Sequence, residues 1–203
     1  MRDLDKALAD ITAIRSQIAA GAAFQGYGPA TVAATGGLAL ATAAAQWVWL
    51  GENPDPLVFF GGWIATAALA AVLIGSEMLA RSRRHHSGLA DALIYNAVET
   101  FVPAGAAGAL LGFVLYQYAP DMLWTLPGLW QVLVSLGLFA SLHSLPANVR
   151  GAAAWYFVAG LGAIVLAAET RSLNPWLMGL PFAVGQFLLA ALLHLATGGE
   201  PDA

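Results

Sequence analysis

An uncharged apolar run, residues 57–76, constrains the fold of this chain more than any other feature. The run contains twenty residues without a charged side chain. An α-helix rises ~1.5 Å per residue, so twenty residues cross the ~30 Å hydrocarbon core of a bilayer. The densest basic cluster of the chain, RSRRHH at residues 81–86, follows directly. Because basic residues beside a span are retained on the cytoplasmic side, this stretch predicts an oriented transmembrane helix.

The composition agrees with a chain that lies mostly inside a membrane. Hydrophobic residues make up 59% of the 203 residues and charged residues 10%, whereas soluble domains carry about 25% charged residues. This length provides room for one bundle of helices with short connections and no separate soluble domain. The chain contains no cysteine, which excludes disulfides, thiolate metal sites, c-type haem attachment and thiol nucleophiles.

Six apolar segments of this kind are predicted. They cover residues 30–50, 57–76, 100–119, 122–142, 151–168 and 173–193. Their polar connections are short, so consecutive segments should be antiparallel neighbours. The predicted fold is therefore all-α: a polytopic integral membrane protein with six transmembrane helices arranged as three antiparallel hairpins, preceded by an N-terminal amphipathic helix.

The distribution of basic residues predicts which side of the membrane each connection occupies. Of the eight lysines and arginines, seven fall on one side of the predicted bundle and Arg171 alone falls on the other. Since cytoplasmic connections are rich in basic residues, this asymmetry places both termini in the cytoplasm and three turns outside a bacterial inner membrane. The outer ends of the spans also carry a predicted aromatic belt of Trp47, Trp49, Trp124 and Trp176.

Residues 3–20 predict the amphipathic helix that precedes the spans. Apolar residues recur there at steps of three and four, at Leu4, Leu8, Ile11, Ile14 and Ile18. Such a helix can anchor the chain at the bilayer surface or dock a membrane or cytoplasmic protein partner. The predicted organisation is this helix and its linker over 1–28, the six-helix bundle over 29–196 and a short polar tail over 197–203.

Two segments resemble a known group of sequences. The first is IRSQI at residues 14–18, which leads to FQGYGP at 24–29; the second is NPWLMGLPF at 174–182, followed by Gly185 and Gln186. Together they resemble an uncharacterised family of small six-helix bacterial inner-membrane proteins. The resemblance implies the six-helix topology and brings no activity with it.

Four ionisable residues form the candidate site for chemistry. Glu77, Glu99, His143 and His194 lie at the margins of four different predicted spans, all near the cytoplasmic rim. Two carboxylates and two imidazoles suit zinc, iron or manganese. His143 and His194 alone would suit the axial positions of a b-type haem.

Each of these residues also has an ordinary explanation. Glu77 precedes Arg81 by four residues, the favoured order for an ion pair within one helix. Asn96 and Glu99 have the spacing of a capping box at a helix start. The two histidines lie where imidazole reaches water between lipid headgroups.

Neutral polar residues and glycines within the spans are predicted to pack helices together. Gln46, Gln117, Gln131 and Gln186 are expected to form hydrogen bonds between helices. Gly108 and Gly112 have the spacing of a close helix contact, which could lie inside the bundle or form the face of a homodimer.

Several familiar activities are excluded or unsupported. The single lysine, Lys6, lies outside every predicted span, so a retinal Schiff base is impossible. The chain contains no Gly-x-Ser-x-Gly, His-Glu-x-x-His or Walker-type motif, and its basic cluster is too short to predict nucleic-acid binding. The sequence favours a non-enzymatic sensor, accessory subunit or scaffold module in the lipid bilayer. The alternative is a metal- or haem-binding redox or transport protein with its site at the cytoplasmic rim.

Overall fold

A computed structural model of the chain describes residue 11 and residues 28–51, 54–84, 90–143 and 149–197, with the backbone alone at 81–84, 90–101, 143, 196 and 197. Six α-helices lie within these residues, together with two short 3-10 segments, and there is no strand in the same part of the chain. The helices are α2 (Pro29–Leu50), α3 (Pro56–Arg84), α4 (Ala90–Tyr118), α5 (Leu126–Ala140), α6 (Arg150–Ala167) and α7 (Pro175–Thr197), and the 3-10 segments are η1 (Pro120–Thr125) and η2 (Ser141–His143). The all-α prediction is confirmed.

Four of the helical segments are long and apolar enough to cross a membrane: Pro56–Ala80, Pro120–Ala140, Arg150–Ala167 and Pro175–Leu195. A further apolar segment, Val102–Tyr118, is shorter. α2 has 22 residues, but alanine, glycine and threonine fill much of it, and it does not reach the same hydropathy. The structure thus supports a helical membrane protein with four or five spans, and a crossing by α2 stays a prediction.

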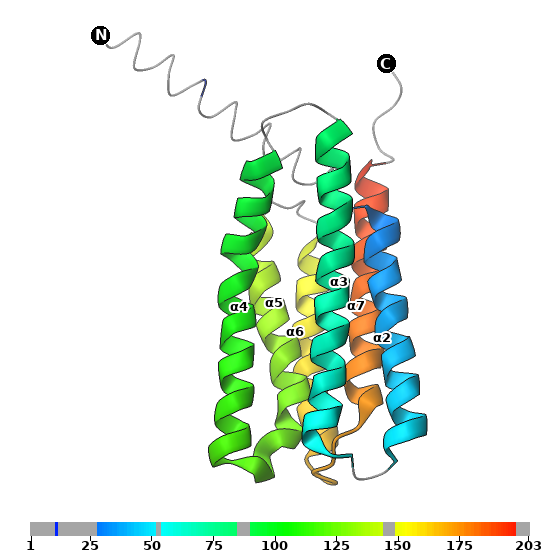
Figure 1. Ribbon diagram of the computed structural model, residues 1–203, viewed down its shortest axis with the longest axis vertical. Coiled ribbons are helices and arrows are strands. Elements are labelled where there is room, and N and C mark those ends of the chain that lie inside the picture. The colour runs from blue at the N-terminus through cyan, green and yellow to red at the C-terminus, as the bar shows by residue number, and fades with distance from the viewer. Residues whose placement is uncertain (1–10, 12–27, 52–53, 85–89, 144–148, 198–203) are drawn as a thin grey trace, which may run out of the picture.

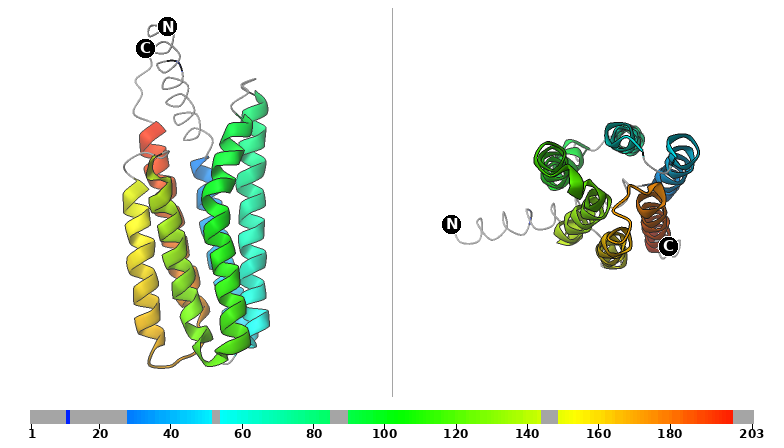
Figure 2. Two further views of the ribbon diagram at one scale, coloured as in Figure 1. Left: turned by 90° about the vertical axis from the view of Figure 1, so that its left-hand side faces the viewer. Right: turned by 90° about the horizontal axis from the view of Figure 1, so that it is seen from below.

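The helices form a closed ring (Figures 1 and 2). Each of α3, α4, α5 and α6 packs against the helices before and after it in the chain, and α7 returns to pack against α2. The most extensive contacts join α2 to α7 and α5 to α6, whereas α3 and α4 touch least among the ring neighbours. The end of α2 and the start of α3 lie at one end of the ring together with residues 119–125 and 168–174, and we call it the three-turn end. α2 begins and α7 ends at the opposite end.

Glycines bring the two closest helix pairs together. A Cβ atom placed on Gly36 of α2 would lie 3.2 Å from the carbonyl oxygen of Ala183 in α7, and one on Gly179 of α7 would lie 3.1 Å from that of Ala39 in α2. Between α5 and α6, a Cβ on Gly160 would lie 2.7 Å from the carbonyl oxygen of Gly128. Small residues let backbones approach where lipid provides no hydrophobic drive for association. These glycines therefore set the two tight seams of the ring.

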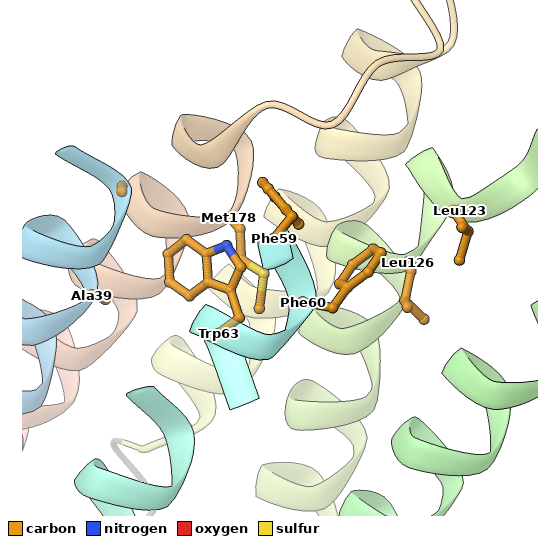
Figure 3. Close-up of a cluster of buried hydrophobic side chains, with 8 residues drawn as sticks. Ala39, Phe59, Phe60, Trp63, Leu123, Leu126 and Met178 are labelled. Carbon is orange, nitrogen blue, oxygen red and sulfur yellow. The ribbon is translucent and has the colours of Figure 1, made fainter. Parts of the chain in front are cut away.

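The largest cluster of buried apolar side chains lies toward the three-turn end (Figure 3). Phe59, Phe60 and Trp63 of α3 reach inward there, beside Leu126 of α5 and Met178 of α7. The rings of Phe59 and Phe60 meet edge to face with centroids 5.1 Å apart, a favoured aromatic geometry. The first two turns of α3 are therefore anchored in the ring.

A proline within α7 creates the main polar contact of the interior. Pro181 has no N–H, so the carbonyl of Leu177 lacks its helical donor. Gln131 of α5 supplies one, and its Nε2 donates to the Leu177 oxygen at 2.9 Å. Two donors of α6 reach the same stretch: Trp155 Nε1 donates to the Pro181 oxygen at 2.8 Å, and the Tyr156 hydroxyl to the Phe182 oxygen at 3.1 Å. α7 is thus tied to both α5 and α6.

Other contacts between helices follow the same pattern of side-chain donor and backbone acceptor. Gln46 Nε2 of α2 donates to the Phe59 oxygen of α3 at 2.9 Å, and Ser135 Oγ of α5 donates to the Ala153 oxygen of α6 at 2.7 Å. The predicted role of glutamines in bonding helices is therefore confirmed for Gln46 and Gln131. Gln117 is exposed.

The glycine pair on α4 packs inside the chain. Cβ atoms placed on Gly108 and Gly112 would each lie 3.4 Å from an atom of α5, in the side chains of Trp130 and Leu126 respectively. Trp130 Nε1 also donates to the Gly108 oxygen at 3.1 Å. A homodimer through Gly108 and Gly112 stays a prediction, and it would have to form beside this occupied contact.

The start of α4 differs most from the prediction. α4 begins at Ala90, so Asn96 and Glu99 lie within the helix and not at its start. The capping-box interpretation of these two residues is therefore wrong. The predicted span starts at residue 100, where the uncharged run begins. α4 starts at Ala90, more than two turns earlier, within a mixed polar sequence.

Replacing Gln131 should reveal its dependence on Pro181. Gln131→Leu leaves the Leu177 carbonyl without a donor, and we expect it to lower the free energy of unfolding by roughly 1 kcal/mol. In a Pro181→Ala background the loss should nearly vanish, because the substituted alanine restores the helical N–H. Gln131 Oε1 has no partner among the described residues. The effect of removing this atom is the same with and without Pro181→Ala, so it cancels when the two losses are compared. Unfolding of detergent-purified protein measures this cycle, and equal losses in the two backgrounds would contradict the dependence.

Candidate functional site

The predicted metal or haem site involves residues that the structure describes unevenly. Glu77 lies on α3 and is half-buried, and His194 lies exposed in the last turn of α7. The backbones of Glu99 and His143 belong to α4 and η2, but their side chains fall outside the described residues. Among the residues that are described, no three of His, Cys, Asp or Glu gather as metal ligands. The four-residue metal site and the haem pair stay predictions.

The apolar stripe of the N-terminal helix is described at one position only. Ile11 is helical, and its side chain is 48% exposed. Leu4, Leu8, Ile14 and Ile18 lie outside the described residues. Docking of a partner by residues 3–20 therefore stays a prediction.

Glu77 occupies a defined position within the ring. Its carboxylate lies directly against Gly28, the N-cap residue of α2, in the space that a Cβ atom on that glycine would fill. The Gly28 carbonyl accepts the first bonds of α2, from the N–H groups of Thr31 and Val32 at 3.1 Å each. A carboxylate at this end of a helix is stabilised by the partial positive charge of the first turn. Glu77 therefore joins α3 to the start of α2.

One outward surface of α3, which the sequence analysis did not single out, is little covered by the rest of the described chain. Only 17% of the most apolar 18-residue window of α3 is buried, compared with 33–44% in three other apolar spans, while Gly108 alone is buried among residues 102–118 of α4. Small or β-branched residues recur along its outward side at steps of four and three. This α3 open face consists of Gly61, Ala65, Ala68, Val72 and Gly75.

The two glycines of the α3 open face differ from those in the tight seams. Cβ atoms placed on Gly61 or Gly75 would have no atom of another described segment within 4 Å, and Val72 is 64% exposed. At Gly36 and Gly160, in contrast, the neighbouring helix fills that space. The α3 open face therefore has the residue types of a packed helix surface, and no helix of the described chain packs on it. In the sequence, small residues spaced four and three apart could have revealed this face.

α3 is held in the ring mainly from the side of α2. Besides the Gln46 and Glu77 contacts, the hydroxyls of Thr42 on α2 and Thr66 on α3 form a hydrogen bond at 2.7 Å. These three contacts lie near the two ends and the middle of α3, so α2 holds it along most of its length. The contact with α4 on the other side is the weakest of the ring.

Replacing Gly28 should have the same effect as neutralising Glu77. Gly28→Ala displaces the carboxylate, and Glu77→Gln removes its charge. We expect each change to lower the free energy of unfolding by about 0.5–2 kcal/mol, and the double variant to be no less stable than the worse single variant. Gly37→Ala is the matched control, because a Cβ on Gly37 meets open space and alanine favours a helix. Thermal unfolding in detergent provides the measurement. If the losses in free energy of unfolding at Gly28 and Glu77 add in the double variant, the two residues do not act through one contact.

Comparisons of this chain with protein-family models, with curated proteins and with solved structures found no match.

Proposed function

We propose that this protein is a non-enzymatic membrane module, an accessory subunit or scaffold, that binds a transmembrane helix of a partner protein on the α3 open face. The observation that carries the proposal is the open space over Gly61 and Gly75, on a helix with 17% of its span buried. At Gly36, Gly160 and Gly179, in contrast, a neighbouring helix of the chain fills this space. Small residues on a lipid-exposed face favour association with a second helix, because backbones can approach there.

The position of α3 in the ring supports the same proposal. α2 holds it through Gln46, Thr42 and Gly28, so a helix docked on the outward side need not displace an existing contact. The weak seam between α3 and α4 leaves further room for a partner on that side. Residues 3–20 provide a second proposed docking element, which would bind the same partner at the membrane surface or in the cytoplasm.

In the proposed membrane arrangement all six helices cross a bacterial inner membrane as three antiparallel hairpins, with both termini in the cytoplasm. α2 has 22 residues, which at ~1.5 Å per residue is enough to span ~30 Å. The three-turn end then lies outside, where Arg171 is the only basic residue. The arginines that follow the apolar part of α3 lie inside.

The proposed orientation is tested with single cysteines, because the chain contains none of its own. A cysteine at Glu169, which is exposed at the three-turn end, should react with an impermeant thiol reagent added to intact cells. A cysteine at Ser82 should react only after the membrane is permeabilised. The opposite labelling pattern would reverse the orientation while leaving the α3 proposal untouched.

The docking proposal is tested with photoreactive side chains introduced on two lipid-exposed faces. Probes at Ala65, Ala68 or Val72 should give a discrete protein adduct in cells, because a partner helix covers them. Probes at Val158 or Val165 of α6, which are 67% and 70% exposed, should give none.

Bulky substitutions then separate docking from folding. Gly75→Leu should abolish the α3 adduct, because a large side chain blocks close approach of the partner. Gly162→Leu is its control on α6, since a Cβ there also meets open space. Adducts of equal yield on both helices would show that the contact is not specific to α3, and adducts on neither would show that no partner covers it; either result would contradict the docking proposal.

A further inference from the structure

The three-turn end contains a hollow to which all three connections contribute. Its volume is about 450 Å³, within the range of roughly 300–1,000 Å³ that is usual for small-molecule sites. The connection between α2 and α3 contributes Pro54 and Pro56, and η1 contributes Asp121 and Trp124. Arg171 and Ser172 complete it from the connection between α6 and α7. We call it the three-turn hollow.

The walls of the three-turn hollow are held by local hydrogen bonds. Asp55 Oδ1 accepts the N–H groups of Leu57 and Val58 at 2.8 and 3.1 Å, which fixes the first turn of α3 beside Pro56. The N–H of Met122 donates to the Ala119 oxygen at 2.9 Å within η1. Proline rings further restrict the backbone. These contacts order the backbone on two sides of the hollow, which lowers the ordering cost of binding.

Arg171 has a backbone conformation that an arginine adopts only at a cost. Its φ is +49°, the sole positive value for a residue other than glycine in the described part of the chain. Its N–H donates to the Ala167 oxygen at 2.7 Å, which closes the turn that follows the end of α6. Glycine or asparagine would adopt this backbone conformation with less strain. Strain of this kind points to a use for the side chain itself.

The three-turn hollow combines opposite charges from two separate connections. The Arg171 guanidinium belongs to one wall and the Asp121 carboxylate to another, and both residues are exposed. No ion pair between them is present in the described structure. A guanidinium binds carboxylate or phosphate with paired hydrogen bonds, whereas a carboxylate beside an indole ring attracts an ammonium group.

We propose that the three-turn hollow binds a small zwitterion, with its carboxylate or phosphate on Arg171 and its ammonium group on Asp121 beside the Trp124 ring. The ligand is either a free solute or the zwitterionic headgroup of a lipid, which share this chemistry. This proposal is tested independently of the proposed docking on α3, because ligand binding is measured on the purified chain without a partner.

Calorimetric titration of the detergent-purified full chain tests the proposal with two probes, O-phosphoethanolamine and β-alanine. At least one should bind saturably at one site. Inorganic phosphate and ethanolamine, which each carry one half of the charge pattern, should bind at least about tenfold more weakly.

Two variants and a control locate the binding. Arg171→Asn and Asp121→Asn should each weaken the probe by at least about tenfold. Arg171→Asn should leave the unfolding temperature unchanged or raise it, because asparagine tolerates the left-handed conformation, so the loss cannot be attributed to misfolding. Glu169→Gln changes an exposed charge of the same connection outside the hollow and should leave binding unchanged.

Three results would overturn the proposal: neither probe saturates, phosphate alone binds as tightly as O-phosphoethanolamine, or Arg171→Asn retains full affinity. The source of the ligand follows from a repeat in lipid nanodiscs. If phosphatidylethanolamine, but not phosphatidylglycerol, competes with the bound probe, the zwitterion is a lipid headgroup. If the affinity is the same in both lipids, it is a free solute.

Discussion

The carbonyl groups of α7 around Pro181 are the acceptors on which the interior arrangement depends. A proline in a membrane helix leaves one carbonyl without its donor, and hydrocarbon offers no water to replace it. Gln131 of α5 fills that position at Leu177, and Trp155 and Tyr156 of α6 bind the carbonyls of Pro181 and Phe182. α7 can therefore occupy only a position that both neighbours reach. Its opposite side then meets α2 through Gly36 and Gly179, and the ring closes.

The positions of the helices along the chain were largely predictable, and the contacts around the ring were not. Apolar runs ended by prolines and polar turns predicted a helix at each of the six places, and a buried glutamine had to find a partner on another helix. The identity of that partner depends on how the helices are rotated, which sequence does not reveal. Glu77 illustrates the difference: its depth followed from its place in α3, whereas its contact with Gly28 needs α2 beside it. The first turns of α4 were missed because their mixed polar sequence resembles a connection.

α3 connects the two proposed functions. Pro56 begins the helix and forms part of the wall of the three-turn hollow. Phe59, Phe60 and Trp63 then fix the next turns in the buried cluster, and the α3 open face begins at Gly61 on the other side of the same turns. Polar contacts with α2 hold one flank along most of the helix, while the outward flank stays available. One helix thus carries both a wall of the three-turn hollow and the proposed docking face.

The pairing of α2 with α7 has a consequence for how the protein is made. The glycine seam between them joins the first and the last helix of the ring. During synthesis this contact can therefore form only after α7 has left the ribosome. Contacts so distant in sequence form late, because the whole intervening chain must be ordered first. Until then α3 is the neighbour of α2 among the described helices, and the hydrogen bonds of Gln46 and Thr42 with that helix can form early. Closure of the ring therefore follows the synthesis of α7, and the nascent chain exposes Gly36 of α2 until then.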